Sequence, residues 1–150
     1  MPIADGLLSD LLALTDCSRT TMRIVGVDGS AHLLAECRAD AGVPSMAGRS
    51  GGIDPRRFPT YTYLEERREL LIQNDTRTDP VSPPPDLIEV HRVHAQMLAP
   101  LIVAGNFVGT LSVHLIGRTR DWSEEQIDAL RRCRAAIEEI LRDAAGARLR

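Results

Sequence analysis

Three histidines, His91, His94 and His114, are the side chains best suited to chemistry near neutral pH. Imidazole titrates close to pH 6.5 and is a common ligand of transition metals and haem iron. His91 and His94 are spaced i and i+3, which places both on one face of a helix. If that helix covers the strand that carries His114, the three imidazoles converge on one site. Otherwise His91 and His94 are solvated, and His114 is a hydrogen-bonded cavity residue.

The residues around His114 alternate between polar and apolar with a period of two. One face of this predicted strand carries Val108, Thr110, Ser112 and His114. The opposite face is aliphatic and carries Leu111, Val113 and Leu115. Hydroxyl and imidazole groups are costly to bury unless a ligand or ordered water satisfies their hydrogen bonds. The polar face therefore predicts a partly polar cavity.

Beyond these strand residues and the histidines, the candidate ligand-binding residues are Tyr61, Tyr63, Asp75 and Met97. The two tyrosines share a face if their stretch is extended, where they either wall a pocket or roof the core. Asp75 follows a short apolar run, and its carboxylate is expected to accept backbone hydrogen bonds there. Met97 begins the apolar run that pairs with the polar strand.

The composition excludes several kinds of chemistry. All 18 cationic side chains are arginine, which rules out a Schiff base and a phosphate-loop lysine. With a net charge of −3 and no basic stripe, we expect no nucleic-acid partner, because phosphate neutralisation supplies most non-specific affinity. Cys17, Cys37 and Cys133 are far apart without CxxC spacing, which indicates reduced packing residues and neither disulfides nor a zinc site.

Two loop segments match ligand-binding motifs only in part. The GRSGG stretch around Arg49 fits no phosphate-loop spacing, so 39–59 is expected to be a long mobile loop. The stretch 75–86 has some character of a calcium loop, but Pro80 and Asp86 stand where glycine and glutamate are required. No catalytic triad is visible locally, although triads can be dispersed in sequence, and we expect that the chain is not an enzyme.

A predicted β-hairpin over 95–117 positions the polar row. Its apolar runs, 97–103 and 107–116, flank Ala104-Gly105-Asn106, where a Gly-Asn turn would supply the positive φ angles of a tight primed turn. The aliphatic face of the hairpin requires a layer of helices to cover it.

The elements before the hairpin follow from periodicity and turn signals. Apolar residues at helical spacing predict an amphipathic helix over 3–14. Two antiparallel strands, 20–27 and 32–38, flank an Asp-Gly turn. A short charged helix or turn over 64–69 then leads into a short strand over 70–73.

Prolines make the stretch after this strand irregular. Asp86 then caps a predicted short helix, with Glu89 completing a capping box and with His91 and His94 on one helix face. This helix is the predicted cover of the cavity.

The last helix has the clearest boundary in the sequence. Ser123 is the predicted N-cap residue, and Gln126 completes a capping box with it. Trp122 precedes the cap and can pack against Ile127 as a hydrophobic staple.

The order of these elements resembles GAF domains and the related PAS-like sensor folds. The matching stretches, in the order and spacing of the family, are LIQNDTRTDP, LAPLIVAGNFVGTLSV and WSEEQIDALRRCRAAIEEIL, within about 21–141. The resemblance implies an α+β fold with a GAF-like antiparallel sheet of five or six strands. In that fold the N- and C-terminal helices cover one face of the sheet, and a ligand cavity lies on the other.

The chain departs from three well-defined activities of that family. Members that bind cyclic nucleotides carry an Asn-Lys pair and a later Asp-Glu, and this chain has no lysine. Phytochrome-type members attach a bilin through a cysteine beside the pocket, and members that reduce free methionine sulfoxide need clustered cysteines there. None of the cysteines of this chain lies in the irregular region or in the hairpin.

We therefore expect a single GAF-like domain over 1–150, with its core at about 20–145. The resemblance implies a non-catalytic sensory domain that binds a small molecule of unknown identity and signals through its terminal helices. Their leucine-rich stripes favour a homodimer. The alternatives are a structural dimerisation domain without ligand, and a redox, metal- or haem-dependent enzyme or sensor that uses the histidines; the cofactor stays open.

The sequence also bears on where the protein is found. It contains no uncharged run of the roughly 20 residues that span a membrane, and no basic start typical of a signal peptide. We therefore expect a cytoplasmic protein without a membrane partner.

Overall fold

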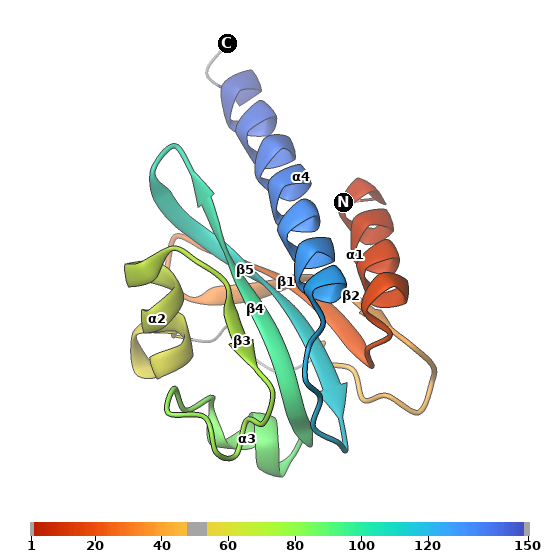
Figure 1. The fold of residues 1–150 in the computed structure, drawn as a ribbon. Helices are drawn as coiled ribbons and strands as arrows, with labels where there is room; N and C mark the ends of the chain where they lie inside the picture. Colours follow the sequence, from red (N-terminus) through yellow and green to blue (C-terminus); the bar gives the residue numbers. More distant parts are fainter. Residues whose placement is uncertain (1, 48–53, 149–150) are drawn as a thin grey trace.

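The computed structural model describes residues 2–47 and 54–148, which form a five-stranded antiparallel sheet with helices on both faces (Figure 1). The strand order is β2-β1-β5-β4-β3. The strands are β1 (Arg19–Val25), β2 (Ala31–Arg38), β3 (Leu71–Gln73), β4 (Val93–Val103) and β5 (Asn106–Ile116). The helices are α1 (Pro2–Thr15), α2 (Pro59–Arg67), α3 (Pro85–Glu89) and α4 (Glu124–Arg148), with a 3-10 turn η1 (Pro55–Arg57).

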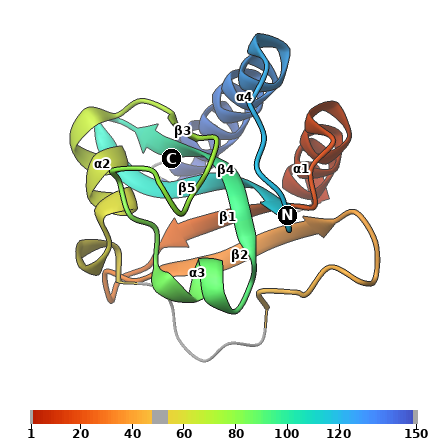
Figure 2. The same cartoon turned by 60° about the horizontal axis from the view of Figure 1, so that its bottom comes forward.

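The two faces of the sheet carry different helices (Figures 1 and 2). The terminal helices α1 and α4 pack on one face, which we call the helix face; α2 and α3 lie on the opposite face, the cavity face. This arrangement confirms the α+β fold expected from the sequence. None of the helices in the described ranges is both long and apolar enough to cross a membrane.

The aliphatic side of the hairpin forms the centre of the main core. Leu111, Val113 and Leu115 are buried with residues of α1 and α4, as their alternation predicted. The fully buried residues of those helices include Leu8 of α1 and Leu130 of α4. At about 1.5–3 kcal/mol for each fully buried leucine or valine, this layer is a large share of the driving force for folding.

The hairpin turn lies one residue earlier than predicted. Positive φ angles occur at Ala104 (52°) and Gly105 (79°), and Asn106 already pairs with Val103 as the first residue of β5. The predicted Gly-Asn turn is therefore wrong, and the two-residue loop is Ala-Gly. A primed turn requires positive φ at both residues. Gly105 adopts this conformation freely, whereas Ala104 adopts it at some energetic cost.

A β-bulge changes the face of one residue in the polar row. Leu101 pairs with Gly109, but Ile102 pairs with Phe107, so Val108 is an extra residue on β5. Val108 packs against the helix-face core, and its predicted position on the polar face is wrong. The bulge reverses the alternation at this point, which periodicity alone does not reveal.

The start of α4 agrees with the predicted capping box. The backbone N–H of Ser123 donates to Oε1 of Gln126 (2.9 Å), and the N–H of Gln126 donates to Oγ of Ser123 (3.1 Å). Trp122 is buried in the main core, and Ile127 packs against the same core, as a hydrophobic staple requires.

The short helix of the irregular region differs from its prediction. Pro84 is the N-cap residue of α3 and makes no side-chain cap, while Asp86 lies inside the first turn. A proline at the first helical position, Pro85, needs no hydrogen-bond partner for its nitrogen, so a capping box is not required. The helix ends at Glu89, and His91 and His94 therefore do not share its face; His91 follows the helix, and His94 belongs to β4.

The tyrosine stretch is helical, not extended. Pro59 opens α2, which contains Tyr61 and Tyr63, so the two rings point in different directions. Tyr61 is buried, whereas Tyr63 is half-exposed and its hydroxyl lies 3.2 Å from Oε1 of Glu69. The condition under which both would share one face, an extended stretch, is therefore not met. The GRSGG stretch lies outside the described residues.

Candidate ligand-binding cavity

Three strands bring polar side chains together on the cavity face. Across the β1–β5 pair, Arg19 lies opposite His114, Thr21 opposite Ser112, and Arg23 opposite Thr110. The next strand, β4, places Gln96 beside His114 and Leu98 beside Ser112. Because alternate residues of neighbouring strands share a face, the polar row of β5 continues across both of its neighbours.

The cavity lies between this polar surface and the elements that cover it. From the sheet it is lined by Thr21, Arg23, Gln96, Leu98, Thr110, Ser112 and His114. The covering residues are Met46, Thr60 and Tyr61 of the chain leading to and forming α2, and Pro84 and Leu87 at α3. Its volume is about 40 Å³. That is room for a few water-sized groups, whereas sites for drug-sized ligands occupy about 300–1,000 Å³.

Hydrogen bonds among the lining residues leave one acceptor open. The hydroxyls of Thr21 and Ser112 bond to one another. Nε2 of Gln96 donates to Oε1 of Gln73 (2.7 Å), and Nε2 of Gln73 donates to the carbonyl oxygen of Val81 (2.6 Å). Oε1 of Gln96 is buried and has no hydrogen-bond partner. A buried acceptor of this kind calls for a donor from water or from a ligand.

Two arginines supply the positive charge of the site. Arg19 is 0% exposed; its Nε donates to Nδ1 of His114 (3.0 Å), its Nη1 donates to the carbonyl oxygen of Pro44 (2.7 Å), and its Nη2 has no partner. Nη1 of Arg23 donates to the carbonyl oxygen of Ala31 (3.1 Å). Within the described ranges, no carboxylate pairs with either guanidinium at 4.0 Å or less.

The acidic residue whose charge favours protonated Arg19, Glu36, is already engaged. Its carboxylate accepts a hydrogen bond from Oγ of Ser45 (2.5 Å) and another from the backbone N–H of Met46 (2.7 Å). Glu36 and Arg19 therefore both bind the segment 44–46, which closes the cavity at Met46.

The electrostatic setting keeps His114 neutral. Burial, and then the charges of Arg19, Arg23 and His91, hold the pKa of His114 well below its usual 6.5. Burial also lowers the pKa of Arg19 to about 10, against the opposing charge of Glu36, so Arg19 still carries its proton at neutral pH. Nδ1 of His114 is then free to accept from Arg19, as the 3.0 Å contact requires.

The ionisation of Tyr61 is also shifted. Burial raises the pKa of this phenol, while the charge of Arg23 and the side chain of Thr110 oppose the shift. Tyr61 is therefore a neutral hydroxyl in the cavity wall.

The structure gathers only some of the predicted site residues. Tyr61, Thr110, Ser112 and His114 line the cavity. His91 is buried after α3, and its charge reaches His114. The other candidates lie elsewhere and are Tyr63, Asp75, His94 and Met97.

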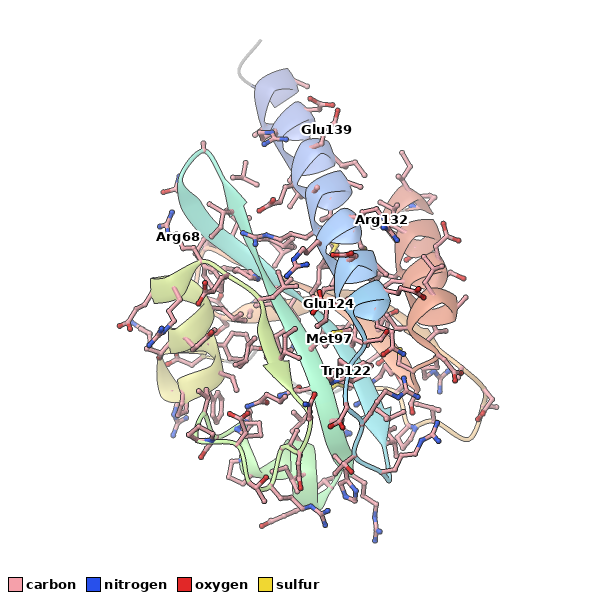
Figure 3. All side chains as sticks on the ribbon, in the orientation of Figure 1. Arg68, Met97, Trp122, Glu124, Arg132 and Glu139 are labelled. Atoms are coloured by element: carbon pink, nitrogen blue, oxygen red, sulfur yellow. The ribbon has the colours of Figure 1, made fainter. Side chains whose placement is uncertain are left out.

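Each of these four residues has another environment. Tyr63 lines a separate open groove on the outer side of α2. Asp75 accepts the N–H of Arg77 (3.0 Å) in the turn after β3, as predicted for a strand end. His94 is half-buried at a register irregularity of β4. Met97 is fully buried on the helix face, near the start of α4 (Figure 3).

Sequence reasoning missed the contribution of β1. Arg19, Thr21 and Arg23 alternate with Thr20, Met22 and Ile24, the same period of two that marked β5. That alternation assigns both arginines to one face, but it does not reveal that the face is buried without a carboxylate. Gln96 and Thr60 were missed as well.

Metal-binding and thiol chemistry find no support at this cavity. Within residues 2–47 and 54–148, no three His, Cys, Asp or Glu side chains are placed to share a metal ion. Cys17, Cys37 and Cys133 are free thiols that belong to, or pack against, the helix-face core. The sheet therefore separates all three from the cavity.

Solved structures of photoreceptor domains share this fold. A red/green cyanobacteriochrome, NpR6012g4 in its red-light-absorbing state, superposes with a TM-score of 0.80 at 18% identity, over 97% of this chain and 96% of that chain. GAF3 from Slr1393 of Synechocystis sp. PCC6803 gives a TM-score of 0.76 at 18% identity, over 99% and 98%. JSC1_58120g3 with bound biliverdin IXa gives 0.73 at 17% identity, over 92% and 86%.

Sequence comparison gives two further results. No curated protein sequence matches the chain. The family model described as GAF domain matches residues 2–141, which include the sheet, the cavity and most of α4. The chain therefore belongs to the GAF domain family.

Proposed function

We propose that this GAF domain is a non-catalytic sensory module whose cavity binds a small molecule. The observation that carries the proposal is the polar lining of a buried space in which Oε1 of Gln96 lacks a partner. Such a group destabilises the empty protein, and a bound molecule that donates a hydrogen bond removes the cost. The likeness to domains such as the one with bound biliverdin IXa supports ligand binding in general terms.

A bilin does not fit this cavity. About 40 Å³ is far too little for a tetrapyrrole, and the free cysteines lie on the helix face, where they cannot attach a chromophore on the cavity face. The proposed ligand is therefore a molecule of a few non-hydrogen atoms.

The proposed output passes from α2 to α4 around the edge of the sheet. Arg68, the C-cap residue of α2, donates from Nη1 to the carbonyl oxygen of Gly105 (2.6 Å), and its own carbonyl accepts Nη2 of Arg134 (3.3 Å). Arg134 of α4 also pairs with Glu138 (3.4 Å). Since Thr60 and Tyr61 of α2 line the cavity, a ligand that shifts α2 changes the contact between Arg68 and α4. Arg68 also lies near the hairpin (Figure 3).

The proposed assembly is a single domain over 1–150 that forms a cytoplasmic homodimer through α1 and α4. The support for dimerisation is apolar surface on α1, where Ile3 is 65% and Leu14 is 61% exposed. The two residues are eleven positions apart, about three helical turns, so they lie on one side of α1, where a partner helix would cover both.

One observation favours a second function, a structural dimerisation domain without ligand. The cavity is narrowed by bulky side chains, among them Tyr61 and Arg23, which a domain without ligand would use to fill its core. The open acceptor of Gln96 favours the sensor, because a filled structural core leaves few buried polar groups unsatisfied.

Calorimetric unfolding of the full chain with a panel of small anions, neutral molecules, amines and haem tests the proposal. A ligand at about 100 times its dissociation constant should stabilise the fold by roughly 2.7 kcal/mol. The triple variant Thr110→Val, Ser112→Ala and His114→Ala should abolish the shift, whereas Thr119→Val, at an exposed position, should not. A shift that survives the triple variant would place the site elsewhere, and no shift with any compound would favour the structural function.

A further inference from the structure

The charge of the cavity points to the class of its ligand. Arg19 and Arg23 extend from the same face of β1 on either side of Thr21. Arg19 is completely buried and Arg23 is 8% exposed. A buried cation is costly unless an anion or a full set of acceptors faces it.

Neither guanidinium has its full set of acceptors. Each carries five N–H donors. Arg19 uses Nε and Nη1, and its buried Nη2 has no partner. Among residues 2–47 and 54–148, the side chain of Arg23 makes one hydrogen bond, to the carbonyl oxygen of Ala31, although it lines the cavity. Donors therefore outnumber acceptors on this side of the cavity.

No side chain of the cavity wall neutralises these charges. The described lining residues include no aspartate or glutamate. Glu36 lies opposite Thr21 on β2 and its charge favours protonated Arg19, but it does not line the cavity, and its carboxylate also pairs with Arg38 (3.8 Å). His114 cannot serve as a counter-ion either, because it is neutral and already accepts from Arg19.

The remaining polar groups of the wall suit an oxygen ligand. Thr60, Tyr61 and Thr110 line the space together with Arg23, and each carries a hydroxyl. The hydroxyls of Tyr61 and Thr110 bond to one another, which leaves one O–H of that pair to donate. A guanidinium binds carboxylates and other oxyanions with two parallel hydrogen bonds, and such charge-assisted bonds are the strong ones. The volume of about 40 Å³ limits the ligand to a few non-hydrogen atoms.

We propose that the cavity binds a small oxyanion, a short carboxylate or an inorganic oxyanion, through the guanidinium of Arg23 and the neighbouring hydroxyls. The assignment rests on the proposed ligand-binding function and narrows it to one chemical class. A deprotonated oxyanion accepts from Arg23 but cannot donate to Oε1 of Gln96, so that acceptor requires a water molecule bound beside the anion. Arg19 contributes charge from beside the site and holds His114 in its neutral form.

Isothermal titration of the full chain tests the class of ligand without any variant. The probes are sodium formate, acetate, nitrate and phosphate at constant ionic strength set with chloride, together with acetamide as the neutral analogue of acetate. At least one oxyanion should bind, and acetate should exceed acetamide by tenfold or more. A stronger response to formate and acetate assigns a carboxylate, and a stronger response to nitrate or phosphate assigns an inorganic oxyanion.

Substitution of Arg23 tests the residue. Arg23→Gln keeps a polar amide but shortens the side chain, leaves two N–H donors and removes the charge, and it should weaken oxyanion binding at least tenfold, whereas Arg23→Lys should retain part of it. The matched control is Arg132→Gln, an exposed arginine of α4 (Figure 3), which should bind as the unaltered chain does. If Arg23→Gln fails to fold, the acetate and acetamide comparison still decides the question.

Three outcomes would overturn the inference. They are measurable and equal binding of acetate and acetamide, unchanged oxyanion binding by a folded Arg23→Gln variant, and no binding of any oxyanion. If neutral molecules then bind in the cavity, the sensory function stands and only the ligand class is wrong. If nothing in the wider panel binds, the proposed function fails together with it.

Discussion

Arg19 donates a hydrogen bond from Nε to Nδ1 of His114, across the β1–β5 pair and at 3.0 Å. Because Nδ1 accepts this bond, the neutral imidazole carries its proton on Nε2. Protonation of Nδ1 would break the bond and place a third cation beside Arg19 and Arg23. The hydrogen bond therefore persists as the pH falls, and it breaks when the pH reaches the lowered pKa of His114.

The first prediction concerns stability against pH. The folded pKa of His114 is lowered, so the unfolded chain takes up a proton near pH 6.5 while the folded chain does not. The free energy of unfolding should fall below about pH 6.5, with a contribution from this group of at most about 1.4 kcal/mol per pH unit, until the folded pKa is reached. Urea denaturation between pH 7.5 and pH 5 measures it.

A matched pair of variants separates His114 from the other titrating groups. His114→Gln should flatten the dependence on pH, whereas His32→Gln, at an exposed position of β2, should leave it in place. An equally steep dependence in His114→Gln would show that another group causes it.

The second prediction concerns the bulge near the hairpin tip. Oε2 of Glu138 accepts the backbone N–H of Ile102 (2.6 Å) at the register shift of β4. Glu138→Ala leaves this partly buried donor without its acceptor and should cost about 1–3 kcal/mol. Glu138→Gln keeps an acceptor oxygen and should cost less. Urea denaturation of these variants beside Glu139→Ala, an exposed neighbour that should change little (Figure 3), tests the assignment.

The third prediction concerns the close approach of β1 and β5. A Cβ added at Gly109 would overlap the carbonyl oxygen of Arg23, whereas one added at Gly146 of α4 would meet nothing within 4 Å. Gly109→Ala should therefore destabilise the fold by at least about 1–3 kcal/mol. Gly146→Ala should stabilise it by about 0.5–1 kcal/mol, because alanine favours the helix. Thermal unfolding of both variants checks the opposite signs, and a neutral Gly109→Ala would contradict the register.

The fourth prediction concerns the assembly. Light scattering at micromolar concentration should give the mass of two chains. Ile3→Glu with Leu14→Glu should give the mass of one chain, because a charged side chain at a buried contact prevents association. Exposed Ala13→Glu, between them in sequence, is the control for added charge on α1. One-chain mass for the unaltered protein would remove dimerisation from the proposal.

Local periodicity predicted the elements whose signals are local. The alternation of Leu111, Val113 and Leu115 and the capping box of Ser123 and Gln126 each depend on neighbours within a few residues, and the structure confirms both. The face of Val108 was lost because a bulge adds a residue without any marker in composition. The partners of Arg19, by contrast, lie as far away as His114, so its burial follows only from the assembled sheet.

The arrangement of the residues that cover the cavity also depends on features that local periodicity does not reveal. Tyr61, a candidate on the basis of residue type, lines the cavity, but its position depends on Pro59, which opens a helix over the stretch that contains both tyrosines. The prediction places His91 and His94 on one helix because it treats the prolines before Asp86 as irregular chain. In the structure Pro84 is the N-cap residue and Pro85 is the first residue of α3, so the helix starts and ends earlier.

The single tryptophan of the chain gives the cavity a built-in optical reporter. The indole N–H of Trp122 donates to the carbonyl oxygen of Gln73 (3.1 Å), and the side chain of Gln73 accepts from Gln96 in the cavity wall. Arg120 lies over the same indole, 5.1 Å from the ring centroid. Fluorescence of the unlabelled protein, excited at wavelengths that tyrosine does not absorb, thus comes from one ring that lies on the helix face and is linked through β3 to the opposite side of the sheet.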